Sequence, residues 1–314
     1  MLKVYLLEGD TFVLSDASVL GKDEKMVWID LTNPTPEEIR TVEQLSQLDL
    51  PNIKETEEIE ASSHYEVYPD GLQVNCSFLH PINGYFSITN VAFLSKANWL
   101  ISLGAREVPL ISRLQRRVRG EDEVITDPLS TIIALIEDKI ERLADLSEEA
   151  HLAVEKISRR IFNRQDIIEE DIIDNLSRQD DLNGKIRLCL MDGHRDLNFL
   201  IRRGRLVERN INTANDILED IKTLLSHNTF LSERLDFLLN ASLGFVNIEQ
   251  NKIIKIFSIV AVVFMPPTVI ASIFGMNFKF MPELSWQWGY PLSLVLMVIA
   301  GISPYIYFKN KGWL

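Results

Sequence analysis

Two long apolar runs near the C-terminus are the strongest feature in the pattern of hydrophobic and polar positions. They cover residues 256–274 and 290–308, and neither contains a charged side chain. A helix needs about 20 apolar residues to cross the hydrocarbon core of a bilayer, which is about 30 Å thick. The pattern therefore predicts two transmembrane helices. The alternative is a pair of core helices in a soluble protein.

Residues 1–127 show a mixed pattern. Four short segments are rich in β-branched and aromatic residues and are bounded by Pro, Gly and Asn turns, which predicts strands over 26–31, 72–79, 89–94 and 99–103. Thr35, Pro36, Glu37 and Glu38 combine a capping residue, a proline and early acids, which is typical of a helix start. We expect this region to form an α/β domain.

Long helices are expected after Pro128, because the next proline is Pro266 and apolar residues recur every three or four positions between them. From residue 212 onward, we expect one helix to continue to residue 274. Three glycines mark the expected breaks, with a corner at the last of them: Gly184, Gly193 and Gly204.

The predicted fold class is an α+β multidomain membrane protein, with six segments along the chain. These are a cytoplasmic α/β domain (1–127), a helical stalk (128–255), a first transmembrane helix (256–274), an external loop (275–289), a second transmembrane helix (290–308) and a basic cytoplasmic tail (309–314).

Four lysines indicate how the spans are oriented. Lys252 and Lys255 precede the first span, Lys309 and Lys311 follow the second, and the connecting loop is neutral overall. The positive-inside rule then places both termini in the cytoplasm. The first ten residues contain no recognisable signal peptide, which is consistent with this orientation.

Charge is divided unequally along the chain. The net charge is −13, but residues 251–314 hold five lysines and one glutamate, so residues 1–250 carry −17. This acidic part argues against nucleic acid as a partner and favours divalent cations. The two cysteines, Cys76 and Cys189, lack the spacing of a zinc site or a disulfide framework, so we expect no bound cofactor and a reducing compartment.

A motif at the outer end of the first span suggests a family. The loop begins with Gly275-Met276-Asn277, continues with residues 281–284 (MPEL), and the second span leads into residues 307–314 (YFKNKGWL). Segments 185–192, 247–257 and 264–268 add to the match, which covers most of the chain. The sequence resembles bacterial CorA family magnesium transporters of the type with two transmembrane helices. The alternative for the tripeptide alone is a helix-terminating turn.

The resemblance implies a funnel-shaped homopentamer in the bacterial inner membrane, with a central pore lined by the first span. It implies transport of Mg²⁺, with Co²⁺ and Ni²⁺ as further ions, and gating by cytoplasmic Mg²⁺. The regulatory site would match Asp216 and Glu58, although the family has Asp where Glu58 stands. A solvated acidic face is the alternative for both residues.

The chemistry of a magnesium pore fits the motif. Mg²⁺ releases water reluctantly, so a pore without ionised ligands would move it with much of its hydration shell. Copies of Asn277 around an axis would accept hydrogen bonds from that shell, and such weak binding lets the ion leave. Gly275 would supply a backbone conformation that other residues resist.

One face of the first span is expected to line the pore. Seven residues, three or four positions apart, form this pore stripe: Asn251, Ile254, Phe257, Ala261, Met265, Thr268 and Ser272. Bulky apolar members at the lysine end suit a hydrophobic gate, with ordinary helix packing as the alternative. Pro266 and Pro267 interrupt the hydrogen-bond ladder, so we expect a kink there.

Two other functions stay open. A zinc or other divalent-cation transporter would share the architecture, but the zinc-transporting relatives replace the residue at Met276 by a smaller aliphatic one. A membrane-tethered enzyme or sensor is the second alternative. The chain has five scattered histidines and neither a GxxxxGK[ST] nor a GxSxG motif, so we predict that it is not an enzyme.

Overall fold

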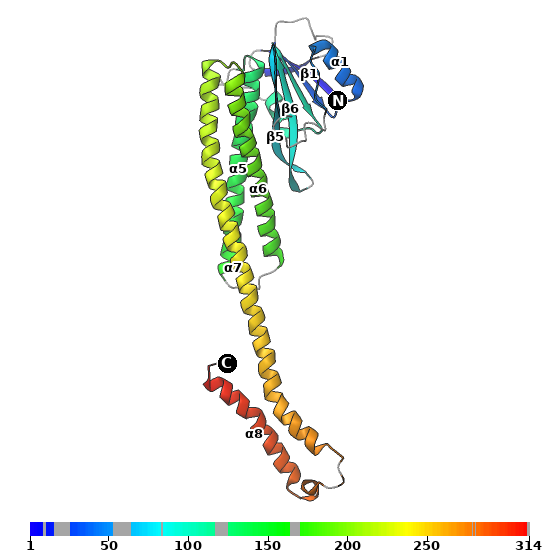
Figure 1. Ribbon diagram of the computed structural model, residues 1–314, viewed down its shortest axis with the longest axis vertical. Helices are drawn as coiled ribbons and strands as arrows, with labels where there is room; N and C mark the ends of the chain where they lie inside the picture. The colour runs from blue at the N-terminus through cyan, green and yellow to red at the C-terminus, as the bar shows by residue number, and fades with distance from the viewer. Residues whose placement is uncertain are drawn as a thin grey trace. The chain divides into compact units, whose positions relative to one another are not determined.

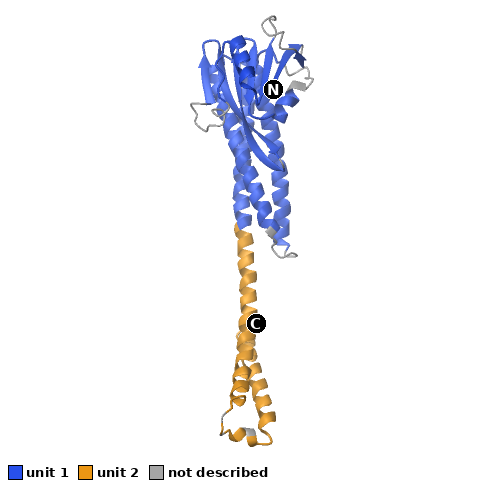
Figure 2. Ribbon diagram, turned by 90° about the vertical axis from the view of Figure 1, so that its right-hand side faces the viewer, with its two compact units in different colours: residues 1–239 blue, residues 240–314 orange. Residues whose placement is uncertain are grey.

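The protein divides into two compact units in the computed structural model (Figure 2). The first is Met1–Leu239 and the second is Asn240–Leu314. The structure describes residues 1–8, 11–15, 26–52, 64–82, 84–116, 125–163, 170–277, 279 and 281–312. The division of the chain at residues 127 and 255 stays a prediction.

A seven-stranded sheet forms the centre of the first unit (Figure 1). Its strands are β1 (Leu2–Glu8), β2 (Thr11–Ser15), β3 (Val27–Thr32), β4 (Tyr65–Tyr68), β5 (Gly71–Ile82), β6 (Tyr85–Lys96) and β7 (Trp99–Gly104). In space the order is β2-β1-β3-β7-β6-β5-β4. The four predicted strands are confirmed as β3, β5, β6 and β7, whereas β1, β2 and β4 were not predicted.

Only β3 and β7 pair in parallel among these strands, with Ile29 opposite Ile101. All the other neighbours are antiparallel. The parallel pair arises because the chain leaves β3, passes through a helix and the β4–β5–β6 meander, and returns in the same direction. A crossover of this kind produces the α/β domain that the sequence predicted.

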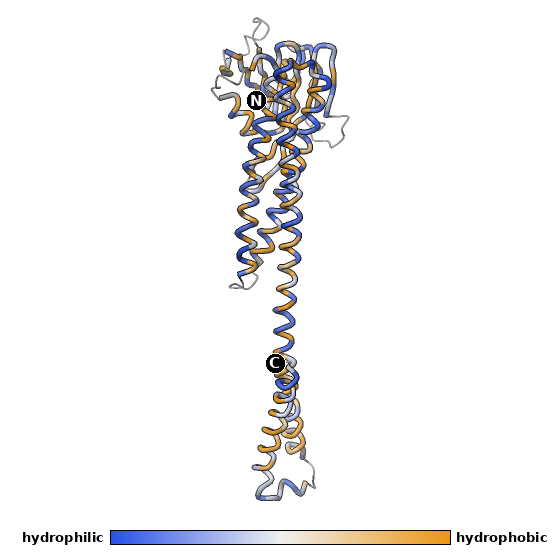
Figure 3. Tube along the Cα trace, turned by 90° about the vertical axis from the view of Figure 1, so that its left-hand side faces the viewer, coloured by the Kyte–Doolittle hydropathy of each residue, from blue (hydrophilic) through white to orange (hydrophobic). Residues whose placement is uncertain are grey.

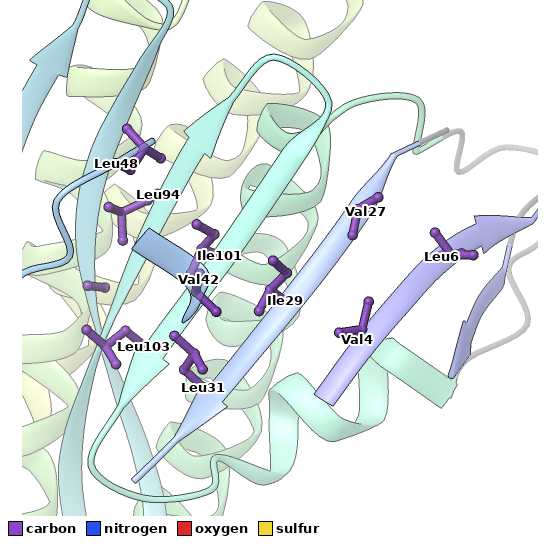
Figure 4. Packing of buried hydrophobic residues seen from close by; sticks show 11 residues of the cluster. Val4, Leu6, Val27, Ile29, Leu31, Val42, Leu48, Leu94, Ile101 and Leu103 are labelled. Atoms are coloured by element: carbon purple, nitrogen blue, oxygen red, sulfur yellow. The ribbon is translucent and has the colours of Figure 1, made fainter. Parts of the chain in front are cut away.

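The central strands are buried on both faces, which explains their nearly continuous apolar sequence. On one face, Ile29 and Leu31 pack with Val42 from α1 (Pro36–Ser46), as Figure 4 shows. On the other face, the Trp28 indole donates a hydrogen bond to the Ser102 hydroxyl (2.9 Å), and Ser102 donates one to the carboxylate of Asp30 (2.8 Å). The polar atoms in this core are thereby paired.

Helix α1 begins as predicted. The Thr35 hydroxyl accepts from the backbone N–H of Glu38 (3.2 Å), and the Glu38 carboxylate accepts from the N–H of Thr35 (2.8 Å), which is a capping box. Glu38 also accepts from the N–H of Leu2 (3.1 Å) and so ties the helix to β1. These hydrogen bonds, the one from Thr35 foremost, lower the pKa of Glu38.

Among the described residues, the other helices are α4 (Pro109–Arg116), α5 (Pro128–Phe162), α6 (Glu170–Arg203), α7 (Glu208–Phe274) and α8 (Gly289–Asn310), with a short 3₁₀ turn η2 (Pro282–Ser285). The predicted continuous helix to residue 274 is confirmed and starts four residues earlier. A break at Gly204 is also confirmed, since a Cβ there would lie 2.6 Å from the carbonyl of Leu200. The breaks expected at Gly184 and Gly193 were wrong, because α6 continues through both.

Inside the first unit, helix α6 pairs with α7 through two buried asparagines. The Asn228 amide donates to the backbone carbonyl of Asn183 (2.8 Å) and to its side-chain oxygen (2.6 Å). The Asn183 amide donates back to the carbonyl of Asn228 (3.2 Å). Reciprocal bonds of this kind fix the register of two helices, because a shift along either axis would leave buried amides unpaired.

A buried ionic network joins α5 and α6 to the sheet. Lys139 of α5 lies 3.2 Å from Asp192 and 3.7 Å from Asp196, both on α6, and all three side chains are almost fully buried. Asp192 also accepts from the backbone N–H of Ser77 in β5 (2.7 Å), and Asp196 accepts from the Tyr65 hydroxyl in β4 (2.9 Å). The Lys139 cation of α5 thus pairs with two carboxylates of α6, and each of these carboxylates is bonded to one of two neighbouring strands.

The two carboxylates of this network titrate differently. Burial and the neighbouring Asp192 charge raise the pKa of Asp196 to about 7. Burial opposes ionisation of Asp192 as well, but Lys139 and the hydrogen bond from Ser77 outweigh it and lower the pKa of Asp192. Asp192 is therefore the carboxylate that holds a negative charge opposite Lys139.

Replacing Lys139 by alanine should destabilise the first unit by about 3 to 5 kcal/mol, because it leaves buried carboxylates without their cation. Thermal unfolding of the full-length protein in detergent, followed by circular dichroism, measures the effect. Arg159→Ala is the matched control, since Arg159 also pairs with a carboxylate, that of Glu155 (2.6 Å), but does so at the surface. Equal melting temperatures for the two variants would contradict the assignment.

Candidate functional site

Within the second unit, the apolar parts of α7 and α8 have almost no protein against them. Of their most apolar windows, 0% of α7 and 11% of α8 is buried. Figure 3 shows the hydrophobic colour concentrated along these helices. A core helix of a soluble protein would be mostly buried. The alternative that these are two core helices of a soluble protein is therefore not supported. Apolar surface of this extent requires lipid or further protein chains to cover it.

The pore stripe lies on this uncovered part of α7. All seven residues are in one continuous helix, and all are exposed in the single chain. Phe257 and Met265 are 70% and 63% exposed although they are large and apolar. A groove of about 470 Å³ runs along the helix past Met265, Thr268 and Ser272 as far as Met276. The groove connects the outer half of the stripe to the tripeptide motif.

The motif follows the end of α7 directly. The N–H of Gly275 donates to the carbonyl of Ala271 (2.9 Å), the N–H of Met276 donates to Ile273 (3.2 Å), and Asn277 leaves the helix exposed. The expectation of a special backbone conformation at Gly275 was wrong, because its φ is not positive. A Cβ there would lie 3.2 Å from the Ala271 carbonyl oxygen, a tight contact that would require a shift of a few tenths of an ångström.

Helix α7 continues through Pro266 and Pro267, and α8 approaches it there. Proline lacks an N–H, so Pro267 leaves the carbonyl of Val263 without its usual helical donor. A Cβ added to Gly301 of α8 would lie 3.5 Å from that carbonyl oxygen and 3.2 Å from Cγ of Pro267. The freed carbonyl therefore faces protein, as a membrane environment requires. Glycine permits this close approach.

The connection between the spans is compact where the structure describes it. Turn η2 contains Glu283, and the N–H of Gly289 donates to Trp286 (3.0 Å) as α8 begins. A Cβ at Gly289 would overlap the carbonyl of Glu283, so only glycine fits. Phe278, next to the motif, lies outside the described residues.

Only one of the two predicted regulatory residues, Asp216, is among the residues that the structure describes. Asp216 lies on α7 in the first unit and is exposed, with the exposed acids Glu219 and Asp220 one turn further along. Glu58 lies outside the described residues. Among those described, no group of three or more His, Cys, Asp or Glu side chains could hold a metal ion. An ion at Asp216 would therefore need ligands from elsewhere.

Two features escaped the sequence analysis although signals for them existed. Lys139 occupies an otherwise apolar stripe of α5, between Ile136 and Leu143, and a charge in such a stripe indicates a buried partner. Gly301 interrupts a span made of large apolar residues, which is typical of a close helix contact. Neither signal identifies the partner residue.

The fold and the uncovered helices define a protein with an N-terminal α/β unit followed by two C-terminal helices able to span a membrane. The family model of CorA-like Mg²⁺ transporter proteins matches residues 23–310. The chain is 42% identical over 290 residues to magnesium transport protein CorA of Pectobacterium atrosepticum, with 92% of each chain covered. It is 40% identical over 317 residues to that of Escherichia coli K12, with 100% of each covered.

A solved structure shares the fold along the whole chain. The complete CorA magnesium transporter from Methanocaldococcus jannaschii superposes with a TM-score of 0.78 at 16% identity, covering 100% of this chain and 99% of that one. The chain therefore belongs to the family of CorA-like Mg²⁺ transporter proteins. Family membership confirms the resemblance inferred from the tripeptide and its surroundings.

Replacing Gly301 by leucine should lower the stability of the protein in detergent by about 1 to 3 kcal/mol, because the side chain would enter space occupied by Pro267. Gly244→Leu is the matched control, since a Cβ at Gly244 meets nothing within 4 Å. The measurement is the thermal unfolding of both variants. If they melt together, the close contact between α7 and α8 does not exist.

Proposed function

We propose that this protein carries hydrated Mg²⁺ across a bacterial inner membrane, down its electrochemical gradient, as a homopentamer. Both termini of each chain would lie in the cytoplasm, and the pore stripe of α7 would face the central axis. The observation that carries the proposal is the exposed stripe of an uncovered helix that ends at Phe274, three residues before Asn277. Membership in the CorA family supports Mg²⁺ as the ion.

The polar members of the stripe favour an axis over lipid. Asn251 is exposed just before the span in sequence, and Thr268 and Ser272 are exposed within it. A polar side chain facing hydrocarbon is costly, although less so for Thr268, whose hydroxyl is bonded to the Phe264 carbonyl (2.7 Å). In a ring of copies the same face would line a water-filled pore. The apolar Ile254 and Phe257 at the lysine end would form a constriction that closes when it loses water.

Asn277 would act as the selectivity filter, together with Gly275 and Met276. Asn277 is exposed and its amide oxygen carries no charge, so a ring of copies would hold the water shell of Mg²⁺ without stripping it. A divalent ion gains about 4.6 kcal/mol per 100 mV on crossing, which suffices to drive entry without nucleotide hydrolysis.

Asn277→Ala should reduce Mg²⁺ flux about tenfold or more, because a lost hydrogen bond to a charged or hydrated-ion group costs about 1.5 kcal/mol or more. Flux into liposomes, read with an enclosed Mg²⁺ dye, measures this. Asn310→Ala changes the same exposed residue type at the opposite end of α8 and should transport normally. Pentamers of Asn277→Ala with unchanged flux would overturn the filter assignment.

The same liposomes distinguish the other functions. We propose that Co²⁺ and Ni²⁺ are carried as further ions and that the chain is not an enzyme, which its membership in a family of ion transporters supports. Zinc flux without magnesium flux would favour the zinc transporter, whereas absence of any cation flux from intact pentamers would favour a membrane-tethered enzyme or sensor.

We further propose that cytoplasmic Mg²⁺ closes the pore by bridging Asp216 to a carboxylate of a neighbouring copy, for which Glu58 is the candidate. The exposure of Asp216 beside two other acids supports this. Like charges facing each other across an interface repel until a divalent ion neutralises them, which biases an assembly with open and closed states.

Asp216→Ala should raise the cytoplasmic Mg²⁺ concentration needed for half-closure by at least about fivefold, the lower range of a typical allosteric coupling. Flux measured at stepped Mg²⁺ concentrations gives the value. Asp236→Ala, an exposed aspartate further along the same helix, is the control. Identical half-closure in both variants would exclude Asp216 as a regulatory ligand.

A further inference from the structure

A second groove lies between α7 and α8 at their lysine end, inside the second unit. Its volume is about 490 Å³, within the range of ligand sites, and it is separate from the groove beside the motif. Three apolar side chains line it: Ile259 and Val262 from α7 and Phe308 from α8. The two helices touch at Pro267 and Gly301, so the groove opens one to two turns from that contact.

Polar groups are gathered at the open end of the groove. Lys255 and Ser258 of α7 and the backbone at Gly312 complete its lining. The Ser258 hydroxyl donates to the carbonyl of Ile254 (2.8 Å), which leaves its oxygen as an acceptor and makes Lys255 the donor available to a ligand. The groove thus joins an apolar floor to a cationic rim.

The rim carries positive charge that carboxylates of this unit do not offset. Lys309 and Lys311 adjoin the lining residues Phe308 and Gly312 in sequence. In the described part of the chain, no carboxylate lies within ion-pair distance of these two lysines or of Lys255, whereas Lys252 has Glu249 at 3.7 Å. The sole acid after residue 250, Glu283, lies before α8 begins, at the other end of that helix.

The dipole of α8 opposes the binding of an anion at this end, but its effect is smaller than that of the lysines. The C-terminus of α8 presents a partial negative charge of about half an electron, which disfavours an anion. Three lysines at the same end outweigh it. The ligand that fits is therefore amphipathic, with an anionic headgroup beside Lys255 and hydrocarbon against Phe308.

We propose that this groove binds an anionic phospholipid of the cytoplasmic leaflet, with its phosphate at Lys255 and an acyl chain along Ile259, Val262 and Phe308. The inference rests on the orientation given under the proposed function, which places the lysine end at the cytoplasmic surface. A bound lipid would fill the space that α7 and α8 leave on the inner side of their contact.

Full-length protein in phosphatidylcholine nanodiscs, with and without phosphatidylglycerol, tests the site. Native mass spectrometry of the released oligomer counts retained phosphatidylglycerol, and thermal unfolding reports its stabilising effect. Lys255→Gln should weaken retention about fivefold, the effect of one lysine at an anionic surface. Lys252→Gln removes the same charge one turn away, outside the groove, and should retain the lipid like the unsubstituted protein.

A second pair of variants tests the apolar part without changing charge. Val262→Trp should fill the groove and abolish retention, whereas Val260→Trp, exposed on the same helix but outside the lining, should not. Equal retention in both lysine variants, or unchanged retention in Val262→Trp, would overturn the site in favour of general surface attraction. Loss of the oligomer in Val262→Trp, without any effect of phosphatidylglycerol, would show that a neighbouring copy occupies the groove and would also overturn it.

Mg²⁺ flux of the unsubstituted protein separates this inference from the proposed function. If the unsubstituted protein carries Mg²⁺ but Lys255→Gln and Lys252→Gln retain lipid equally, the lipid site is refuted and the transport proposal is not. Retention that depends on Lys255, in a protein that carries no Mg²⁺, would refute the transport proposal and leave the lipid site standing.

Discussion

A helix in hydrocarbon must satisfy its own backbone and its own polar side chains, because lipid offers no hydrogen-bond partner. The second unit meets this constraint locally. Thr268 donates to the carbonyl of Phe264 (2.7 Å) and Ser258 donates to Ile254 (2.8 Å), so both hydroxyls are bonded inside α7. The prolines inside the helices free carbonyls from this pattern, and for one of these, the carbonyl of Val263 freed by Pro267, Gly301 brings α8 against it. The pairing of the two helices therefore follows from a proline that would otherwise expose backbone to lipid.

The first unit solves the opposite problem, since it buries charge in a core surrounded by apolar side chains. Lys139, Asp192 and Asp196 are costly to desolvate, and a set of packed apolar residues would hold the helices as well or better. The contribution of the network is to fix the position of α6 on the sheet. Each carboxylate bonds to a particular strand residue, Ser77 or Tyr65, so α6 has one position on the sheet at which both of these hydrogen bonds form.

Local signals in the sequence were sufficient for much of the fold. The absence of charge over two long segments identified α8 and the end of α7, and Thr35 with Glu38 identified the start of α1. Gly184 was mistaken for a break because a helical glycine costs only about 1 kcal/mol, which the packing of a long helix overrides.

The rest depends on residues that are distant in sequence. Strand β1 could not be recognised without its pairing to β3, and Lys139 pairs with Asp192, which is 53 residues away. For the candidate site, the sequence located Asn277 and the stripe, but no single chain contains the ring of copies that would turn an exposed helix face into a pore wall. Asp216 presents the same difficulty, because among the described residues no group of three or more His, Cys, Asp or Glu side chains could hold a metal ion.

The order of the two units along the chain has a consequence for synthesis. The first unit is complete at Leu239, and its sheet, its capped helix and its buried network involve no residue beyond that point. Domains fold as units while the chain is still being made, N-terminal parts first. The first unit can bury its core before the apolar helices leave the ribosome. The segments most prone to aggregate in water are thus made after the first unit and are attached to an already folded, strongly acidic domain.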